Sequence, residues 1–204
     1  MLSASEIESI SSGVSIWRLY DPAVKADLYS TALTMGGRTY LIDPIPLACV
    51  ALAQLAAQSP IAGIVITNEN HIRATPDFTV QFPVPVYFHP ELSDRVALPS
   101  AQPIQDAGSF VPGLTAIAIE GAAAGEIALY SDADRGALVV GDALINFEPY
   151  GFTFLPAKYC SNPKAMRRSL TQLLDYSLER ILFAHGTPIV SDARQRLKML
   201  LEQG

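Results

Sequence analysis

The chain has few charged residues, few histidines and few cysteines for its 204 residues. Charged residues make up 17% of it, whereas roughly 25% is usual for a soluble chain. We expect the missing charge to reflect surface that is buried on folding or against another copy of the chain, as in a homodimer or other homo-oligomer. Apolar residues make up 50% and the mean hydropathy is +0.25, which excludes a disordered chain. The length predicts one domain over residues 1–204, with a core that needs no disulfides.

Long apolar runs are also missing. The most apolar stretch, residues 45–57, is interrupted by Gln54 and is shorter than the roughly 20 residues of a membrane-spanning helix. The first six residues contain neither a basic segment nor an apolar run, so we expect no signal peptide. With a net charge of −6 and an isoelectric point near 5.0, the chain is not expected to bind nucleic acid or a membrane. Cys49 and Cys160 are expected to be reduced thiols of a cytoplasmic protein.

The three histidines, His71, His89 and His185, are all the imidazoles that the sequence offers. Sites that need four or more imidazoles are therefore excluded. The sequence also lacks the Gly-x-Ser-x-Gly elbow, the phosphate-binding loop, the Cys-x-x-Cys pair and the Gly-x-Gly-x-x-Gly turn. A serine hydrolase built on His185 and Asp142 would need an exposed serine, and no motif identifies one.

The apolar pattern predicts strands interspersed with a few helices. Strands are predicted over residues 14–19, 28–33, 39–43, 61–66, 84–88, 114–119, 126–130, 137–140 and 181–184. Helices are predicted over residues 47–57, near 76, and over 163–176 and 191–202. Residues 99–112 and the segment after Asp142 are predicted to be irregular. Each half then begins with strands and adds helices, which suggests two stacked sheets with helices outside. Periodicity alone leaves α/β and α+β open.

Polar residues follow several of these predicted strands. Thr67-Asn68-Glu69-Asn70-His71-Ile72-Arg73 follows one strand, Gly121-Ala122-Ala123-Ala124-Gly125-Glu126 precedes another, and Gly141-Asp142 and His185-Gly186 end two more. In this order the segments resemble those of the metallo-β-lactamase-fold hydrolases, which include glyoxalase II-like and lactonase-like enzymes. The resemblance runs from about the first strand to the last helix. It implies an α/β fold, a four-layer α/β/β/α sandwich.

The same resemblance implies a dinuclear zinc site whose ligand motif is incomplete here. The family's bridging aspartate and last histidine are present as Asp142 and His185. The other ligand positions carry Asn68, Asn70, Ile72, Arg73 and Ala122. An asparagine oxygen is a weak zinc ligand, and isoleucine, alanine and arginine offer no ligand atom. We therefore expect the dinuclear zinc site to be lost and no metal cofactor to be present.

Arg73 suggests what could replace the metal. It falls where a ligand histidine of the family would face the bridging aspartate, so its guanidinium could pair with Asp142, with Glu126 as a neighbour. A buried carboxylate without a cation costs several kcal/mol or becomes protonated, and a bidentate arginine pair would remove that cost. This hypothesis is a metal-free site.

A second arrangement uses His71, which lies one position from the family's second histidine. Together with His185 and Asp142 it offers the ligand types of a rearranged mononuclear site, for one divalent metal such as zinc. His89 is expected to be structural. Tyr159 lies in the segment where the family often lines its substrate pocket.

These observations leave two functions open. The leading interpretation is a non-catalytic protein, a pseudoenzyme that binds a small molecule, regulates or serves as a structural subunit, with Asn68, Asn70, His71, Arg73, Glu126 and Tyr159 around the old cleft. The alternative is a hydrolase of an ester, thioester or lactone. It would use either the non-standard mononuclear metal or a metal-free pair in which Asp142 orients His185 as the base.

Overall fold

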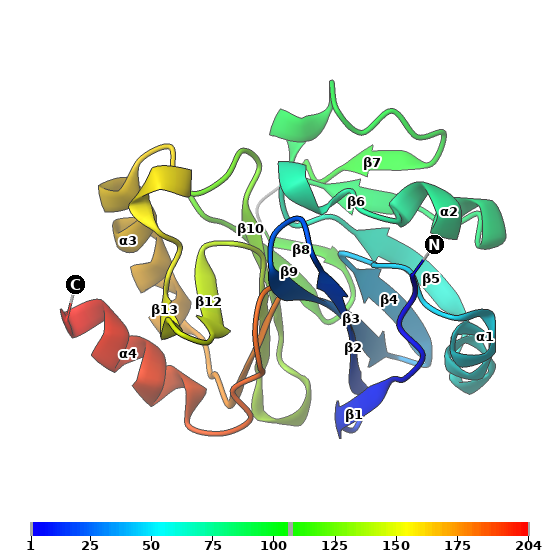
Figure 1. Ribbon diagram of the computed structural model, residues 1–204, viewed down its shortest axis with the longest axis horizontal. Coiled ribbons are helices and arrows are strands. Elements are labelled where there is room, and N and C mark those ends of the chain that lie inside the picture. The colour runs from blue at the N-terminus through cyan, green and yellow to red at the C-terminus, as the bar shows by residue number, and fades with distance from the viewer. Residues whose placement is uncertain (1, 106–107, 204) are drawn as a thin grey trace.

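Two β-sheets lie between two layers of helices in the computed structural model, which describes residues 2–105 and 108–203 (Figure 1). The first sheet has the order β1-β2-β3-β4-β5-β6-β7. Its strands are β1 (Glu8–Ser11), β2 (Val14–Asp21), β3 (Ala26–Met35), β4 (Arg38–Ile42), β5 (Ile61–Val65), β6 (Val86–Phe88) and β7 (Ala101–Pro103). Strands β1 to β4 are antiparallel, and β4 to β7 are parallel. The parallel strands bring their carboxyl ends to one edge of the sheet.

The second sheet has the order β14-β11-β10-β9-β8. Its strands are β8 (Gly108–Val111), β9 (Leu114–Ala118), β10 (Ile127–Ser131), β11 (Ala137–Val140) and β14 (Arg180–Phe183). Strand β14 is parallel to β11, and the other neighbours are antiparallel. A separate hairpin follows β11 and consists of β12 (Leu144–Phe147) and β13 (Gly151–Phe154). Because β11 and β14 are parallel neighbours, the residues that follow them lie side by side.

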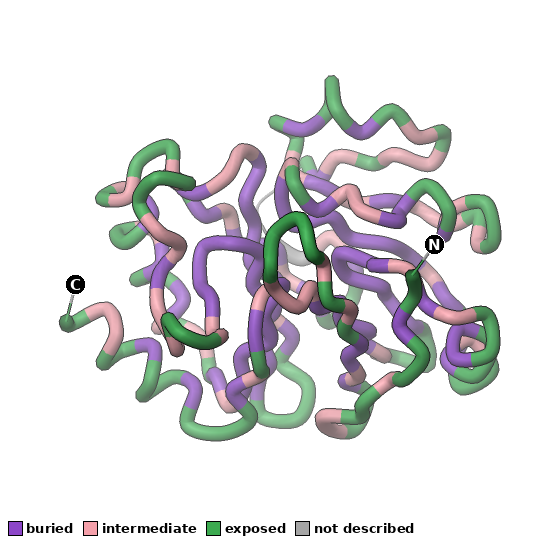
Figure 2. The backbone as a smooth tube through the Cα atoms, in the orientation of Figure 1, coloured by how far each residue is buried: buried purple, intermediate pink, exposed green. Residues whose placement is uncertain are grey.

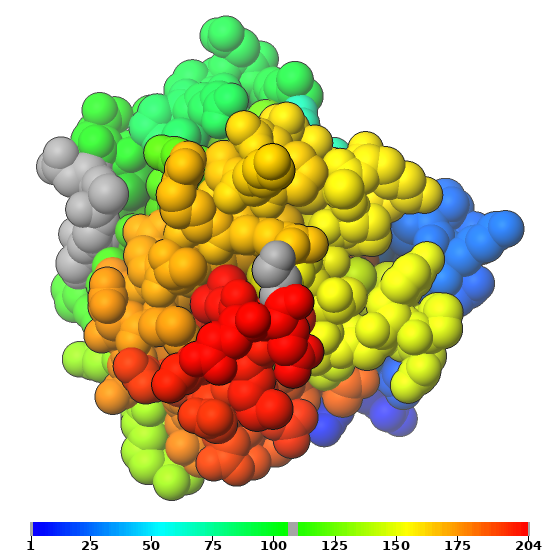
Figure 3. All heavy atoms as spheres, turned by 90° about the vertical axis from the view of Figure 1, so that its left-hand side faces the viewer, coloured from blue at the N-terminus to red at the C-terminus, as the bar shows by residue number. Residues whose placement is uncertain are grey.

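The helices divide between the two outer faces. Helices α1 (Cys49–Gln58) and α2 (Thr75–Gln81) cover the first sheet, and α3 (Pro163–Leu170) and α4 (Ala193–Gln203) cover the second (Figure 1). Figure 3 faces the second helical layer, where the C-terminal segments form most of the surface. Short 3-10 helices include η1 (Glu69–His71), η2 (Pro90–Leu92), η3 (Ala133–Arg135), η4 (Ala157–Tyr159) and η5 (Thr171–Asp175). Among the described residues, no helix is both long enough and apolar enough to cross a membrane.

Three apolar clusters fill the three spaces between the layers. In β4, Leu41 faces α1 and α2 whereas its neighbour Ile42 faces the other sheet. In β11, Leu138 faces the second helical layer whereas Val139 faces the first sheet. Successive side chains of a strand point to opposite faces, so strands that are buried on both sides need continuous apolar runs. Figure 2 shows this burial along the central strands.

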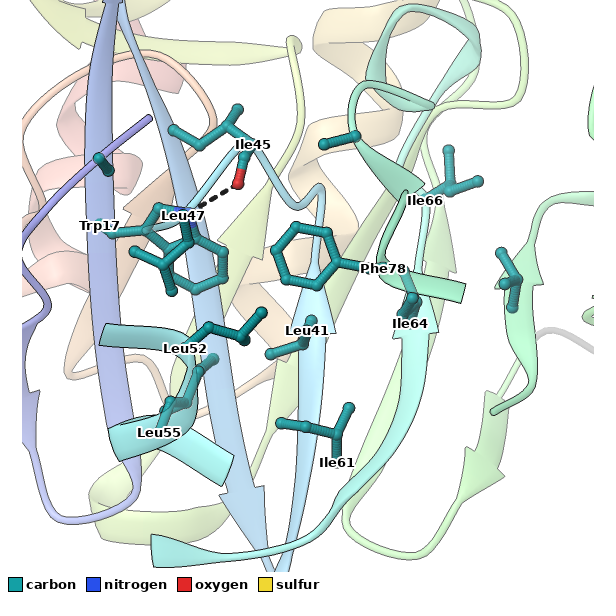
Figure 4. Close-up of a cluster of buried hydrophobic side chains, with 14 of the residues drawn as sticks. Trp17, Leu41, Ile45, Leu47, Leu52, Leu55, Ile61, Ile64, Ile66 and Phe78 are labelled. Atoms are coloured by element: carbon teal, nitrogen blue, oxygen red, sulfur yellow. Dashed lines mark hydrogen bonds between the residues drawn. The ribbon is translucent and has the colours of Figure 1, made fainter. Parts of the chain in front are cut away.

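The cluster under α1 and α2 is drawn in Figure 4. The indole of Trp17 is 1% exposed and its Nε1 donates a hydrogen bond of 3.0 Å to the carbonyl of Ile45. Leu52 and Leu55 of α1 pack beside it from the helical side. The indole therefore links the first sheet to the segment that leads into α1.

The sandwich predicted from the resemblance is confirmed, but several short elements were missed. The segment 99–112, predicted to be irregular, contains β7 and β8, and its residues 106–107 lie outside the described part of the chain. The segment after Asp142 contains the β12–β13 hairpin, and β1 was not predicted. Strands of three or four residues are too short to show a period. The predicted helix 163–176 is α-helical only to Leu170 and then continues as η5.

A substitution in the first cluster tests this packing. Leu41→Ala should lower the free energy of unfolding by about 2–5 kcal/mol, because the side chain is fully buried and its removal leaves a cavity. Urea unfolding followed by Trp17 fluorescence measures the change. Val80→Ala, on the exposed face of α2, is the control and should change the stability by less than about 0.5 kcal/mol. Equal effects of the two substitutions would contradict the layer assignment.

Candidate metal centre

The loop after β5 is held by a buried carboxylate at the end of β4. Asp43 is 2% exposed, and its Oδ1 accepts a hydrogen bond of 2.8 Å from the backbone N–H of Thr67. Its Oδ2 accepts a second hydrogen bond, of 2.6 Å, from Thr67 Oγ1. Strands β4 and β5 are parallel neighbours, so the two residues that follow them come together. The contact fixes the start of the 67–73 loop.

Asp43 also orients His71. The imidazole is 1% exposed, and its Nδ1 lies 2.9 Å from Asp43 Oδ2 and 2.9 Å from Thr67 Oγ1. An ionised carboxylate only accepts hydrogen bonds, so Nδ1 carries the hydrogen and donates it to Asp43. The other nitrogen, Nε2, is buried and makes no hydrogen bond among the described residues. A carboxylate that holds one nitrogen of a histidine while the other points into a site is typical of metal-ligating histidines.

Asp142 and His185 meet His71 from the second sheet. They follow the parallel strands β11 and β14. Asp142 Oδ1 lies 3.2 Å from His71 Nε2 and 3.3 Å from His185 Nε2, and the two imidazole rings are 5.6 Å apart between centroids. One ligand atom from each of the three residues lies within 4.8 Å of the other two. The three residues that the sequence offered as an alternative set of ligands therefore lie together in the structure.

The charges of these groups depend on one another. Burial alone would raise the pKa of Asp142, but His71 and His185 hold it well below its usual range. Burial and the Arg73 cation lower the pKa of His71, but Asp142 and Asp43 outweigh them and raise it to about 9. For His185, burial dominates over the hydrogen bond with Asp142, and the pKa is lowered. Without a metal, the imidazolium of His71 is therefore the positive charge beside Asp142.

Arg73 does not make the contact that its position in the sequence suggested. Its Nη1 donates to the carbonyl of Tyr29 at 2.8 Å and to the carbonyl of Asp43 at 3.2 Å. Within residues 2–105 and 108–203, no ion pair joins Arg73 to Asp142. The predicted bidentate pair is therefore wrong.

The backbone of Arg73 has a left-handed φ of 42°. Burial would raise the pKa of the Asp43 carboxyl, but His71 first and Arg73 second lower it below its ordinary value.

A family model described as the metallo-beta-lactamase superfamily matches residues 10–203. The chain belongs to this superfamily. A metallo-beta-lactamase from Pontibacter korlensis is 15% identical, with a TM-score of 0.75 over 98% of this chain and 99% of that one. One from Erythrobacter litoralis is 16% identical, with a TM-score of 0.71 over 97% and 96%. A metallo-beta-lactamase family protein from Thermus thermophilus is 21% identical, with a TM-score of 0.67 over 96% and 80%. The comparison with curated proteins finds no match.

This metallo-beta-lactamase fold carries amide side chains, those of Asn68 and Asn70, at two positions where the resemblance predicted histidines. Asn68 Nδ2 donates to Glu126 Oε2 at 2.7 Å, and its Oδ1 accepts from the N–H of Asn70 at 2.9 Å. Asn70 Nδ2 donates to Asp142 Oδ2 at 3.3 Å. Burial and the nearby Asp142 raise the pKa of Glu126, whereas the hydrogen bonds that it accepts from Ala143 and Asn68 favour its ionised form. Ala122 is buried and offers no ligand atom. The residues therefore do not fit the family's dinuclear zinc site.

The residues do fit one metal ion. Zinc ligands in a tetrahedral site lie about 3.3–3.5 Å from one another, which is close to the spacing of Asp142 Oδ1 from each of the two histidine nitrogens, and the whole set of ligand atoms lies within 4.8 Å. The buried Nε2 of His71 makes no hydrogen bond among the described residues. A bound metal ion would give this nitrogen a partner. His71, Asp142 and His185 are the candidate ligands.

A cavity of about 520 Å³ adjoins this centre. Its lining includes Asn70 and Glu126, which contact Asp142, and Tyr159 and Cys160 from the region of η4. Tyr159 is 60% exposed at its rim. The cavity gives a small molecule room next to the candidate metal centre.

Sequence reasoning did not single out Asp43 and Thr67 as functional residues. A signal was present, because Asp43 ends an apolar strand and Thr67 begins the loop after the next one. The sequence does not show that the side chain of His71 points toward Asp142 and His185.

Asp43→Ala tests the role of this carboxylate. It leaves Thr67, His71 and Arg73 without a buried negative charge, so we expect the free energy of unfolding to fall by about 3–5 kcal/mol. Urea unfolding of the metal-free protein measures it. Asp94→Ala, at an exposed aspartate, is the matched control and should change the stability by less than about 0.5 kcal/mol. A loss in Asp43→Ala as small as that of the control would refute the proposed role.

Proposed function

We propose that the chain is a hydrolase that holds one divalent metal ion, such as zinc, with His71, Asp142 and His185. The observation that carries the proposal is that one ligand atom from each of these residues lies within 4.8 Å of the other two, with Asp142 Oδ1 3.2 Å from His71 Nε2 and 3.3 Å from His185 Nε2. Three protein ligands leave one position open, as in catalytic zinc sites. When bound, such an ion would polarise a substrate carbonyl and activate water for its attack.

The protein's own residues hold and orient this centre. Asp43 keeps the hydrogen on Nδ1 of His71, which leaves Nε2 to bind. Asn70 donates to Oδ2 of Asp142, which leaves Oδ1 facing the two imidazoles. The exposed fraction rises from 2% for the side chain of His71 to 11% for Asp142 and 19% for His185. A substrate would therefore approach from the side of Asp142 and His185.

The substrate class that we propose is an ester, thioester or lactone. Hydrolysis of each needs attack on a polarised carbonyl, and the adjoining cavity could accept the acyl group or the leaving group. A fold alone does not determine function. The proposal therefore rests on the superfamily and on the geometry of the site together.

One observation favours a second candidate, a non-catalytic protein that binds a small molecule without a metal. The raised pKa of His71 places an imidazolium between Asp43 and Asp142. With Arg73 nearby, these charges balance without a metal ion. The adjoining cavity would then be the binding site, and the chain would serve a regulatory or structural role.

Metal analysis separates the two candidates. Protein purified without chelator and equilibrated with zinc should hold one zinc ion per chain. His71→Ala, Asp142→Ala and His185→Ala should lose it, because each removes a ligand. His89→Ala is the matched control and should keep the ion. A wild-type chain that holds no zinc under these conditions would exclude the metal-dependent hydrolase.

Turnover provides a second test. Aryl esters, thioesters and lactones should be hydrolysed by the zinc-loaded protein, and a chelator should remove the activity. Asp142→Ala should lower kcat/KM by at least about 100-fold, since the loss of groups that merely orient metal ligands already costs about 10–100-fold. Stoichiometric zinc without turnover on any of these substrates would contradict the hydrolase and favour a binding protein.

A further inference from the structure

Glu126 is a buried carboxyl group that joins three segments around the candidate metal centre. It immediately precedes β10 and is 2% exposed. Its Oε1 accepts hydrogen bonds from the backbone N–H groups of Asp142, at 2.8 Å, and Ala143, at 3.0 Å. Its Oε2 accepts from Asn68 Nδ2 at 2.7 Å. One side chain thus fixes the loop after β11 and the loop after β5.

These hydrogen bonds reach Asp142 by two routes. The direct route holds the main chain of Asp142 through its N–H. The indirect route passes through Asn68, whose Oδ1 accepts from the N–H of Asn70, whose side chain in turn donates to Asp142 Oδ2. Both the backbone and the outer carboxylate oxygen of Asp142 therefore depend on Glu126.

Gly141 shows how closely these groups pack. A Cβ atom on Gly141 would lie 2.6 Å from Thr67 Oγ1, 2.8 Å from Glu126 Oε1 and 2.9 Å from Asn68 Nδ2. The main chain of the β11 loop thus lies directly against the side chains of the other two segments. A larger residue at position 141 would force these hydrogen-bonded side chains to shift.

We propose that Glu126 is a positioning residue that sets the place of Asp142 in the metal centre. The proposal rests on the proposed function for its metal, but the geometry is that of the chain alone. Glu126 is suited to the task because both of its oxygens accept hydrogen bonds from fixed donors. In glutamine, one oxygen would become an N–H₂ group that faces the N–H₂ group of Asn68, and two donors do not bond.

The polarity of this contact can be reversed. In the double variant Glu126→Gln with Asn68→Asp, the new amide nitrogen at position 126 would donate to one oxygen of the new carboxylate at position 68. The other oxygen of that carboxylate could still accept from the N–H of Asn70, and the amide oxygen at position 126 would still accept from the main chain of residues 142 and 143. The double variant therefore keeps every hydrogen bond, whereas each single variant breaks the contact between positions 68 and 126.

The experiment measures Co²⁺ binding to the full chain by the visible absorption of the ion. Glu126→Gln should bind Co²⁺ about 10–100-fold more weakly than the wild type, the usual effect of losing a group that orients a metal ligand. Asn68→Asp alone should also weaken binding, because it places two carboxyl groups in contact. The double variant should recover the wild-type affinity and spectrum. Glu8→Gln, at an exposed position of β1, is the control and should match the wild type.

Nitrogen NMR of the imidazoles of His71 and His185 in the metal-free protein gives a readout that needs no metal. Glu126→Gln should shift these signals by moving Asp142, and the double variant should restore them. If the wild type binds no Co²⁺, the metal centre fails while the NMR data still decide the role of Glu126. Unchanged affinity and unchanged imidazole signals in Glu126→Gln would overturn the proposal. A double variant that folds with the wild-type Tm but recovers neither the Co²⁺ affinity nor the imidazole signals would also overturn the proposal.

Discussion

The buried carboxylate of Asp43 is the group on which the rest of the site depends. It lies at the end of β4, accepts two hydrogen bonds from Thr67 and orients His71 through Nδ1. A buried negative charge is costly unless it is paired and hydrogen-bonded, and His71 and Arg73 supply the pairing. These hydrogen bonds of Asp43 hold the loop that carries His71 in its conformation. In this sense the first sheet determines where the candidate metal centre forms.

Glu126 is the corresponding anchor on the second sheet. The two carboxyl groups act from opposite sides, since Asp43 orients His71 whereas Glu126 holds the main chain of Asp142. The sheets are also joined directly, because the N–H of Tyr29 donates to the carbonyl of Ala184, next to His185, at 2.9 Å. The same Tyr29 accepts from Arg73 through its carbonyl. The three candidate ligands thus come from loops that are tied to each other across the sandwich.

Most of the fold could be predicted from the sequence, and part of the site could not. Asp142 and His185 end apolar strands, and the order of motifs placed both beside the cleft. His71 was harder, because a shift by one residue normally turns a side chain away. The 3-10 turn over Glu69–His71 and the bond to Asp43 bring it back, and neither is visible in a pattern of single residues. Arg73 was assigned the wrong partner because its contacts are the backbone carbonyls of Tyr29 and Asp43, which leave no signal in the sequence.

The central claim is that His71, Asp142 and His185 hold one metal ion in this member of the metallo-beta-lactamase superfamily. Anomalous diffraction at the zinc edge, from crystals grown with zinc, tests it most directly. The account predicts a single peak within bonding distance, about 2.0–2.2 Å, of His71 Nε2, Asp142 Oδ1 and His185 Nε2. A map without a peak between these three atoms, with His71 Nε2 hydrogen-bonded to Asp142 instead, would contradict it.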